Sequence, residues 1–97
     1  MTSFRILPQA SEELEAAVGY YNSQRAELGT IFLNEFEKTV ERISNLPMAA
    51  RIVRGSVRRR PIHRFPFSVL YRPGTDEIVI VAVAHRRRRP GYWLGLS

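Results

Sequence analysis

Residues 77–93 read EIVIVAVAHRRRRPGYW, and this stretch decides the expected fold. Its first part, Ile78 to Ala84, has seven residues without a polar side chain, and five of them are Val or Ile. Such a run is typical of a strand that is buried on both faces of a sheet. Because β-branched residues lose rotamer freedom in a helix, a strand is favoured over a helix. The sequence therefore predicts a central strand that leads directly into four arginines and an aromatic tail.

Two more strands are predicted just upstream, at Val57 to Arg64 and at Phe67 to Arg72, and the turn sequence PGTD at residues 73–76 joins the second to the central strand. Proline cannot donate a hydrogen bond to a neighbouring strand, so Pro61 predicts that the first of them lies at a sheet edge. Residues 48–56 have no clear periodicity and are expected to form a loop, with at most a short strand near its middle.

The N-terminal half predicts a strand and two amphipathic helices. Phe4 to Leu7 is a short apolar segment that Pro8 ends, and it has to join the sheet to be stable. Apolar residues recur at helical spacing from Gln9 to Arg25, and again from Phe32 to Ile43. The expected fold is α+β: an N-terminal strand and a two-helix antiparallel hairpin packed on one face of a small antiparallel β-sheet, in a single domain over residues 1–97.

The simplest hairpin register divides the sheet into two faces. The face expected under the helices carries Ile62, Phe67, Val69, Tyr71, Ile78, Ile80, Ala82 and Ala84. The opposite face carries Leu70, Val79, Val81 and Val83, bordered by Arg59, His63, Arg72 and His85. If the helices leave this second face open, it is an apolar patch with a basic rim, which marks a protein-binding surface. The isolated chain is then expected to self-associate, and a bound partner to raise its melting temperature.

Charge is distributed very unevenly along the chain. Residues 1–50 carry four basic and seven acidic side chains, a formal charge of −3, whereas residues 51–97 carry eleven arginines and two carboxylates, a formal charge of +9. Arginine pairs bidentately with phosphate or carboxylate. The clusters at residues 58–60 and 86–89 therefore suit nucleic acid or an acidic protein partner, with Tyr71, Tyr92 or Trp93 available to stack on a base.

Several functional classes are disfavoured. There is no cysteine, so disulfides and thiolate chemistry are excluded. His63 and His85 are expected to lie roughly 15 Å apart, at about 3.3 Å per residue and 4.8 Å per strand, which is too far for a general acid–base pair. Two histidines without a third ligand also predict no metal site. The chain has neither a signal peptide core nor an apolar run of membrane-spanning length, so a soluble, cytoplasmic protein without cofactors is expected.

The order and spacing of residues resemble the RelE/ParE superfamily of bacterial toxins, and most of all its ParE-like, plasmid stabilization branch. The resemblance spans nearly the whole chain and rests on Ala17, Tyr20, Tyr21, Leu28, Gly29, Phe32, Glu35, Ile43, Pro47, Phe65, Pro66, Phe67, Tyr71, Ala82, Val83, Ala84, His85, Arg87, Arg88, Pro90, Tyr92 and Trp93. The only lysine, Lys38, lies on a predicted helix, whereas RelE-like toxins also use lysine in the sheet. This difference favours the ParE branch.

The resemblance implies the toxin of a type II toxin–antitoxin pair, neutralised in an oligomeric complex by a cognate antitoxin whose flexible C-terminal segment folds onto it. ParE-like toxins are associated with poisoning DNA gyrase by binding, whereas RelE-like toxins cut messenger RNA on the ribosome. The leading hypothesis is therefore inhibition of gyrase without catalysis. A ribosome-dependent endoribonuclease is the alternative, and a nucleic-acid-binding module without toxicity is the third hypothesis.

Each hypothesis assigns residues. Antitoxin contacts are expected at Arg59, His63, Leu70, Arg72, Val79, Val81 and Val83. Target contacts are expected at Arg86, Arg87, Arg88, Arg89, Tyr92 and Trp93, although Trp93 is expected mainly to anchor the tail to the core. In the endoribonuclease alternative, the catalytic residues would be Arg59, Arg64, His85, Arg87 and Tyr92.

Overall fold

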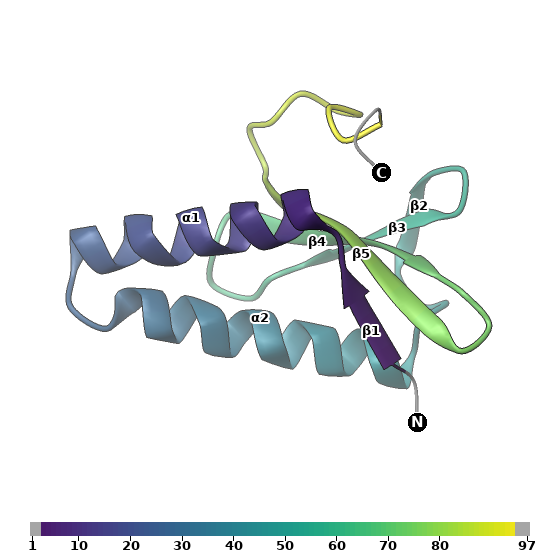
Figure 1. Cartoon of the computed structure of the whole chain (residues 1–97), viewed down its shortest axis with the longest axis horizontal. Coiled ribbons are helices and arrows are strands. Elements are labelled where there is room, and N and C mark those ends of the chain that lie inside the picture. Colours follow the sequence, from purple (N-terminus) through teal and green to yellow (C-terminus); the bar gives the residue numbers. More distant parts are fainter. Residues whose placement is uncertain (1–2, 95–97) are drawn as a thin grey trace.

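A computed structural model describes residues 3–94 and has the predicted order of elements. The elements are β1 (Ser3–Ile6), α1 (Pro8–Gln24), α2 (Leu28–Asn45), β2 (Arg51–Arg54), β3 (Val57–Pro61), β4 (Phe67–Pro73) and β5 (Glu77–His85). The two helices run antiparallel to each other as a hairpin and lie together against one face of the sheet, as Figure 1 shows. The predicted α+β architecture is confirmed.

The sheet has five strands in the order β1-β5-β4-β3-β2, and it is mixed rather than antiparallel. β1 pairs in parallel with β5, while the other neighbours are antiparallel. The parallel pair is possible because the helical hairpin and three strands separate β1 from β5 along the chain. The expectation that Pro61 marks an edge strand is wrong, since β3 pairs with both β2 and β4. Pro61 lies beyond the residues of β3 that pair with β2, so its missing N–H leaves no gap in that ladder.

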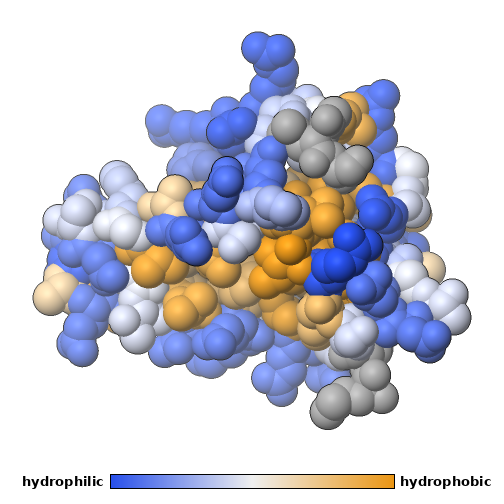
Figure 2. Space-filling view, viewed as in Figure 1, coloured by the Kyte–Doolittle hydropathy of each residue, from blue (hydrophilic) through white to orange (hydrophobic). Residues whose placement is uncertain are grey.

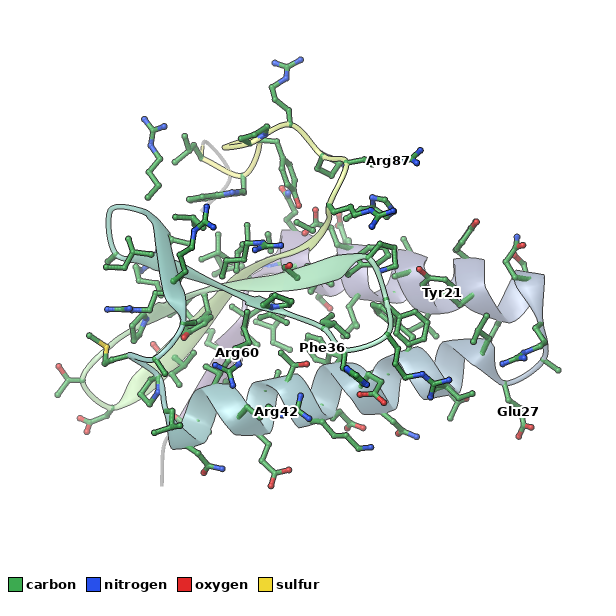
Figure 3. The ribbon with its side chains drawn as sticks, turned by 180° about the vertical axis from the view of Figure 1, so that it is seen from behind. Tyr21, Glu27, Phe36, Arg42, Arg60 and Arg87 are labelled. Carbon is green, nitrogen blue, oxygen red and sulfur yellow. The ribbon has the colours of Figure 1, made fainter. Side chains whose placement is uncertain are left out.

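Most of the core lies between the helices and the sheet. α2 contributes Phe32, Phe36 and Ile43, all buried, because apolar residues recur along one of its faces. Tyr21 of α1 extends this core through contacts with the rings of Phe32 and Phe65, with ring centres 5.3 and 4.9 Å apart. Figure 3 shows Tyr21 and Phe36 pointing from their helices toward the interior. Neither helix is long and apolar enough to cross a bilayer in the part of the chain that is described.

A β-bulge in β5 changes which residues face the helices. Leu70 pairs with Ala82 but Tyr71 pairs with Ile80, so Val81 is an extra residue opposite β4. Side chains alternate along a strand, and one extra residue reverses the alternation beyond it. Val83 therefore joins Ile78 and Ile80 in the core under the helices. The expectation for the two faces was wrong at this end of β5: Ala82 and Ala84 lie on the second face, and Val83 does not.

The second face of the sheet is covered by the chain itself. Trp93 packs with Leu70, Val81 and Ala82, and only 6% of its surface is exposed. The segment after β5 folds back over the sheet, and the β2–β3 hairpin lies across from this segment (Figure 1). Leu70 and Val81, which pack in this cluster, are consequently at most 5% exposed, and Val79 is also 5% exposed. The apolar patch on which the self-association prediction rested is therefore absent from the surface.

Candidate functional site

The arginines gather around a groove on this second side of the sheet, which we call the arginine groove. Its volume is about 480 Å³. One wall comes from the β2–β3 hairpin and the other from the segment after β5, and the floor is the apolar face of the sheet. The lining residues are Arg51, Ile52, Val53, Arg54, Arg59, Leu70, Ala84, His85, Arg86, Arg88, Arg89, Pro90, Gly91, Tyr92 and Trp93.

The arginine groove is strongly and uniformly positive. Six arginines line it, three on each wall, and none of its lining residues is acidic. Within residues 3–94, ion pairs form only between Arg5 and Glu77 and between Lys38 and Glu35, so no groove arginine is neutralised by a carboxylate there. Arg88 stacks on the ring of Tyr92, 3.9 Å from its centre. Such a site attracts anions and repels cations.

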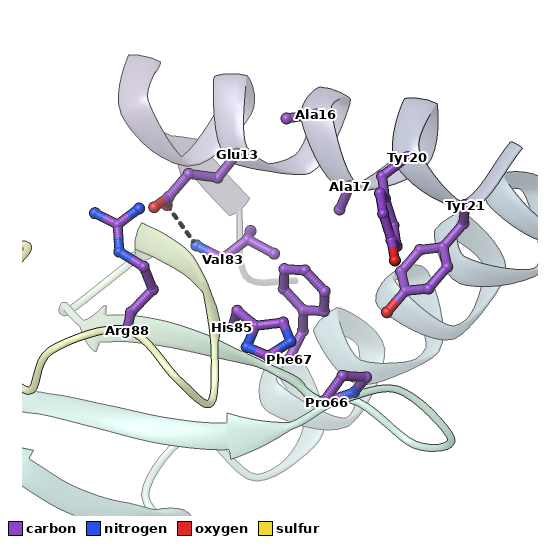
Figure 4. A pocket seen from close by; sticks show the side chains of 10 residues that line it. All are labelled: Glu13, Ala16, Ala17, Tyr20, Tyr21, Pro66, Phe67, Val83, His85 and Arg88. Atoms are coloured by element: carbon purple, nitrogen blue, oxygen red, sulfur yellow. Dashed lines mark hydrogen bonds between the residues drawn. The ribbon is translucent and has the colours of Figure 1, made fainter. Parts of the chain in front are cut away.

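One carboxylate of α1 holds the tail wall in place. Glu13 accepts a hydrogen bond from the backbone N–H of Val83 through Oε1, at 2.9 Å, and one from the hydroxyl of Tyr92 through Oε2. The first bond, which Figure 4 shows, gives a partner to the backbone N–H of Val83. Val83 lies on β5 beyond Ile80, the last residue that pairs with β1. Burial, and then the hydrogen bond to Glu13, raise the pKa of Tyr92 well above its ordinary value. Tyr92 is thus a neutral hydrogen-bond donor that ties the tail to α1.

Sequence reasoning did not find this role of Glu13, although a signal was present. Glu13 lies three residues after Ala10 and four before Ala17, the two residues of α1 that are buried. Residues at this spacing share one helix face, so an acidic side chain there points toward the sheet. A carboxylate on the buried side of an amphipathic helix needs a donor, and here the donors are Val83 and Tyr92.

His85 lies between the arginine groove and a second cleft of about 450 Å³ between α1 and the end of the sheet. This cleft is drawn in Figure 4 and includes Ala17, Tyr20 and Phe67. The ring of His85 packs edge-on against Phe67, with ring centres 5.0 Å apart. Its Nδ1 accepts a hydrogen bond from the backbone N–H of Arg87 at 3.0 Å. A neutral histidine that accepts at Nδ1 carries its proton on Nε2.

The residues predicted for the target surface are mostly brought together. Arg86, Arg88, Arg89, Tyr92 and Trp93 all line the arginine groove. Arg87 is not among its lining residues and points away from the body of the protein (Figure 3). The predicted packing role of Trp93 is confirmed by its burial.

The set proposed for RNA cleavage is split. Arg59, His85 and Tyr92 line the groove, whereas Arg64 and Arg87 do not. Arg64 lies in the turn between β3 and β4 with a φ of 74°, a left-handed conformation that residues other than glycine rarely adopt.

The residues predicted for antitoxin binding do not form one accessible surface. Arg59 and Arg72 are partly exposed and His63 is exposed. The apolar members, Leu70, Val79, Val81 and Val83, are buried inside the chain itself. Because the bulge and the covering tail were not anticipated, the apolar half of this prediction falls on the core.

A different apolar groove does lie open at the other edge of the sheet, and we call it the β1 groove. It has a volume of about 540 Å³ and is lined by Phe4, Ile6, Phe36, Glu37, Val40, Glu41, Ser44 and Ile80. In Figure 2 the apolar surface is concentrated where β1 meets the helices, with hydrophilic side chains around it. Ile6 is 39% exposed, and β1 has an unpaired outer edge. Open strand edges with apolar neighbours suit the addition of a strand from another chain.

No group of three or more histidine, aspartate or glutamate side chains in residues 3–94 could hold a metal ion.

Comparisons with known proteins point to one family. The model of the family described as the ParE toxin of the type II toxin–antitoxin system parDE matches residues 4–90. Among solved structures, the chain is similar to one described as the chromosomal ParDE TA system from P. aeruginosa, with a TM-score of 0.77 and 22% sequence identity. That alignment covers 88% of this chain and 96% of the other, and it shows a shared fold. A comparison with curated proteins found no match.

Proposed function

The chain belongs to the ParE toxin family of type II toxin–antitoxin systems, and from this premise we propose that it inhibits growth by binding DNA gyrase and is neutralised by a cognate antitoxin. The observation that carries the proposal is the arginine groove, a built cavity with six arginines and no acidic residue in its lining. A surface of this kind is suited to a large anionic target. In this proposal the toxin acts in the cytoplasm, where it is held in an oligomeric complex until the antitoxin is lost.

The groove supports binding better than catalysis. RNA cleavage needs a base that removes the proton of the 2′-hydroxyl. Nδ1 of His85 already accepts a hydrogen bond from the backbone N–H of Arg87, so this nitrogen is not free to act as that base. Tyr92 is no better suited, because its hydroxyl donates to Glu13 and its pKa is raised. These two contacts favour the gyrase proposal over a ribosome-dependent endoribonuclease.

The first test is to induce the chain in growing bacteria and to pulse-label DNA and protein synthesis side by side. We expect DNA synthesis to stop first. If protein synthesis stops first, the endoribonuclease alternative replaces the gyrase proposal.

A test with purified components addresses the target directly. The purified chain at micromolar concentration is added to gyrase and relaxed plasmid. We expect supercoiling to be inhibited and cleaved plasmid to accumulate. Unchanged supercoiling in this assay, together with growth arrest in cells, would retain the toxin and reject gyrase as its target.

For the antitoxin, the β1 groove is the better docking surface. It offers an unpaired strand edge, an exposed Ile6 and an apolar lining, whereas the second face of the sheet is already covered. Glu37 and Glu41 of α2 line the other side of this groove and would pair with basic residues of an incoming segment. We therefore propose that the antitoxin segment adds a strand at β1. The partly exposed Arg59 and Arg72 and the exposed His63 remain available to acidic residues elsewhere in the antitoxin.

A further inference from the structure

We propose that the arginine groove holds a single nucleic-acid strand through its phosphodiester backbone, without reading the sugar. The inference rests on the proposed function for where the strand is met, namely the DNA held by gyrase. The inference goes beyond the proposed function, because a groove that contacted only the protein surface of gyrase would not need to bind a nucleic-acid strand.

The placement of the arginines fits a chain of phosphates. Arg51, Arg54 and Arg59 form one wall, and Arg86, Arg88 and Arg89 form the other. Arg54, Arg86 and Arg89 are exposed, so their guanidinium groups can reach a ligand that enters from solvent. Guanidinium binds phosphate through two parallel hydrogen bonds, and a nucleic-acid strand presents phosphates at regular intervals. A volume of about 480 Å³ suits a short stretch of one strand rather than a duplex.

The floor of the groove argues against an acidic peptide. A peptide that binds tightly in extended form usually pairs its backbone with an open strand edge. The floor here is a sheet face with the side chains of Leu70, Ala84 and Trp93, which offers no backbone groups for pairing. The outer edge of β2 borders one wall, but this strand has only four residues, Arg51–Arg54, and gives a peptide little backbone to pair with. The unpaired edge of β1 lies at the opposite side of the sheet. An apolar floor instead suits the flat faces of sugars and bases.

The lining has few side chains that would distinguish RNA from DNA: apart from the arginines, its hydrogen-bonding side chains are His85, Tyr92 and Trp93. A protein recognises the 2′-hydroxyl of RNA with hydrogen-bonding side chains. Among residues 3–94, no Ser, Thr, Asn, Gln, Asp or Glu lines the groove. The one hydroxyl present, that of Tyr92, already donates to Glu13. The groove is therefore expected to bind DNA and RNA strands of equal length with similar affinity.

The direct test measures fluorescence anisotropy of labelled oligomers of about 12 units with the purified full chain and without gyrase. The probes are oligo-deoxythymidine, oligo-uridine and oligo-glutamate. We expect the two nucleic acids to bind within about threefold of each other and oligo-glutamate to bind at least about tenfold more weakly. Affinity for the nucleic acids should fall steeply with salt, by about 0.7 log units per log unit of salt for each phosphate contacted.

The variant that tests the groove is R54A/R89A, which removes one exposed arginine from each wall. Its matched control is R25A/R42A, which removes two exposed arginines of the helical hairpin and changes the net charge equally. We expect R54A/R89A to bind at least about tenfold more weakly with a shallower salt dependence, and the control to stay within about threefold of the unchanged chain.

Three results would overturn the inference: equal losses in the two double variants, oligo-glutamate binding as tight as oligo-deoxythymidine, or oligo-uridine binding more than about tenfold tighter than oligo-deoxythymidine. The gyrase assay separates this inference from the proposed function. Normal strand binding without any effect on gyrase rejects gyrase as the target and leaves the strand site. Inhibition of gyrase without strand binding rejects the strand site and leaves the target.

Discussion

At the scale of single residues, Gly29 shows how closely the two helices pack. Its backbone N–H donates to Oδ1 of Asn22 at 2.8 Å. A Cβ at this position would overlap the backbone oxygen of Val18 and lie 2.6 Å from the Asn22 side chain. The backbone oxygen cannot move away without shifting α1. We therefore expect G29A to lower the free energy of unfolding by about 1–3 kcal/mol, measured by chemical denaturation.

The matched control is G19A in the same hairpin. Gly19 is exposed in the middle of α1, and a Cβ there would meet nothing within 4 Å. Since alanine is the better helix former, this change should raise stability by up to about 1 kcal/mol. A loss of stability in G19A as large as that in G29A would show that helix packing at Gly29 is not the cause.

Tyr92 gives a prediction that depends on pH. Its pKa in the folded chain is raised, so the hydrogen bond to Glu13 contributes fully below about pH 10, the ordinary pKa of tyrosine. This contribution is lost as pH rises toward the folded pKa. Y92F should cost about 1–3 kcal/mol at pH 8, because the carboxylate loses a donor. Above pH 10 the difference between Y92F and the unchanged chain should shrink.

The comparison isolates Tyr92 because both proteins keep Tyr21 and Tyr71, whose pKa values burial also raises. Unfolding by denaturant at several pH values measures the effect. Y20F, at an exposed tyrosine, is the control and should match the unchanged chain at pH 8, where Y92F shows its full loss. A gap between Y92F and the unchanged chain that stays constant through pH 11 would contradict the role given to the Tyr92 hydroxyl.

At the scale of elements, the sequence predicts where helices and strands lie better than how they face. The helix expected at Gln9 to Arg25 is found at Pro8–Gln24. The central strand expected at Ile78 to Ala84 is found at Glu77–His85, one residue longer at each end. Periodicity and proline position determine these bounds. The bulge at Val81 has no such signal in the sequence. All residues from Ile78 to Ala84 are apolar, so both possible alternations look alike.

The groove shows a similar division. The arginines and the packing of Trp93 could be predicted, because charge and aromatic residues stand out along the chain. That the tail would fold back and bury Leu70 and Val81 could not, since it depends on contacts between segments far apart in sequence. The unpaired edge of β1 was missed for a related reason. Its parallel pairing with β5 follows from the path of the helical hairpin, which no local pattern reports.

The open edge of β1 leads to a prediction about the antitoxin. Ile6 lies in the β1 groove and is 39% exposed. Lysine at this position would place a charge among apolar side chains that an added strand would have to bury. We expect I6K to weaken binding of the cognate antitoxin at least about tenfold in a titration of the purified proteins, while the free chain stays folded.

M48K serves as the control, since Met48 is an exposed apolar residue outside the lining of the β1 groove. Its affinity for the antitoxin should remain within about twofold of the unchanged chain. If I6K binds the antitoxin normally, the added strand does not lie at β1, and the exposed surface near Arg59 and Arg72 becomes the next one to test.

At the scale of the whole molecule, the two proposed surfaces lie at opposite edges of the sheet. The β1 groove includes the first strand of the order β1-β5-β4-β3-β2, and the arginine groove includes the last. Four strand spacings of about 4.8 Å separate them, roughly 19 Å. About six extended residues would be needed to span that distance, so a short segment that binds at β1 leaves the arginine groove free.

This separation predicts that toxicity and antitoxin binding can be lost independently. R54A/R89A weakens only the arginine groove, so its induction in growing bacteria should no longer arrest growth, because the anionic target loses one contact on each wall. The purified variant should still bind the antitoxin through the β1 groove. R25A/R42A, with the same change in net charge, should arrest growth as the unchanged chain does. Colony counts after induction, with expression matched by immunoblot, measure the effect.

Full toxicity in R54A/R89A would move the target surface away from the arginine groove. Loss of toxicity in both double variants would instead show that overall charge, rather than the groove, attracts the target.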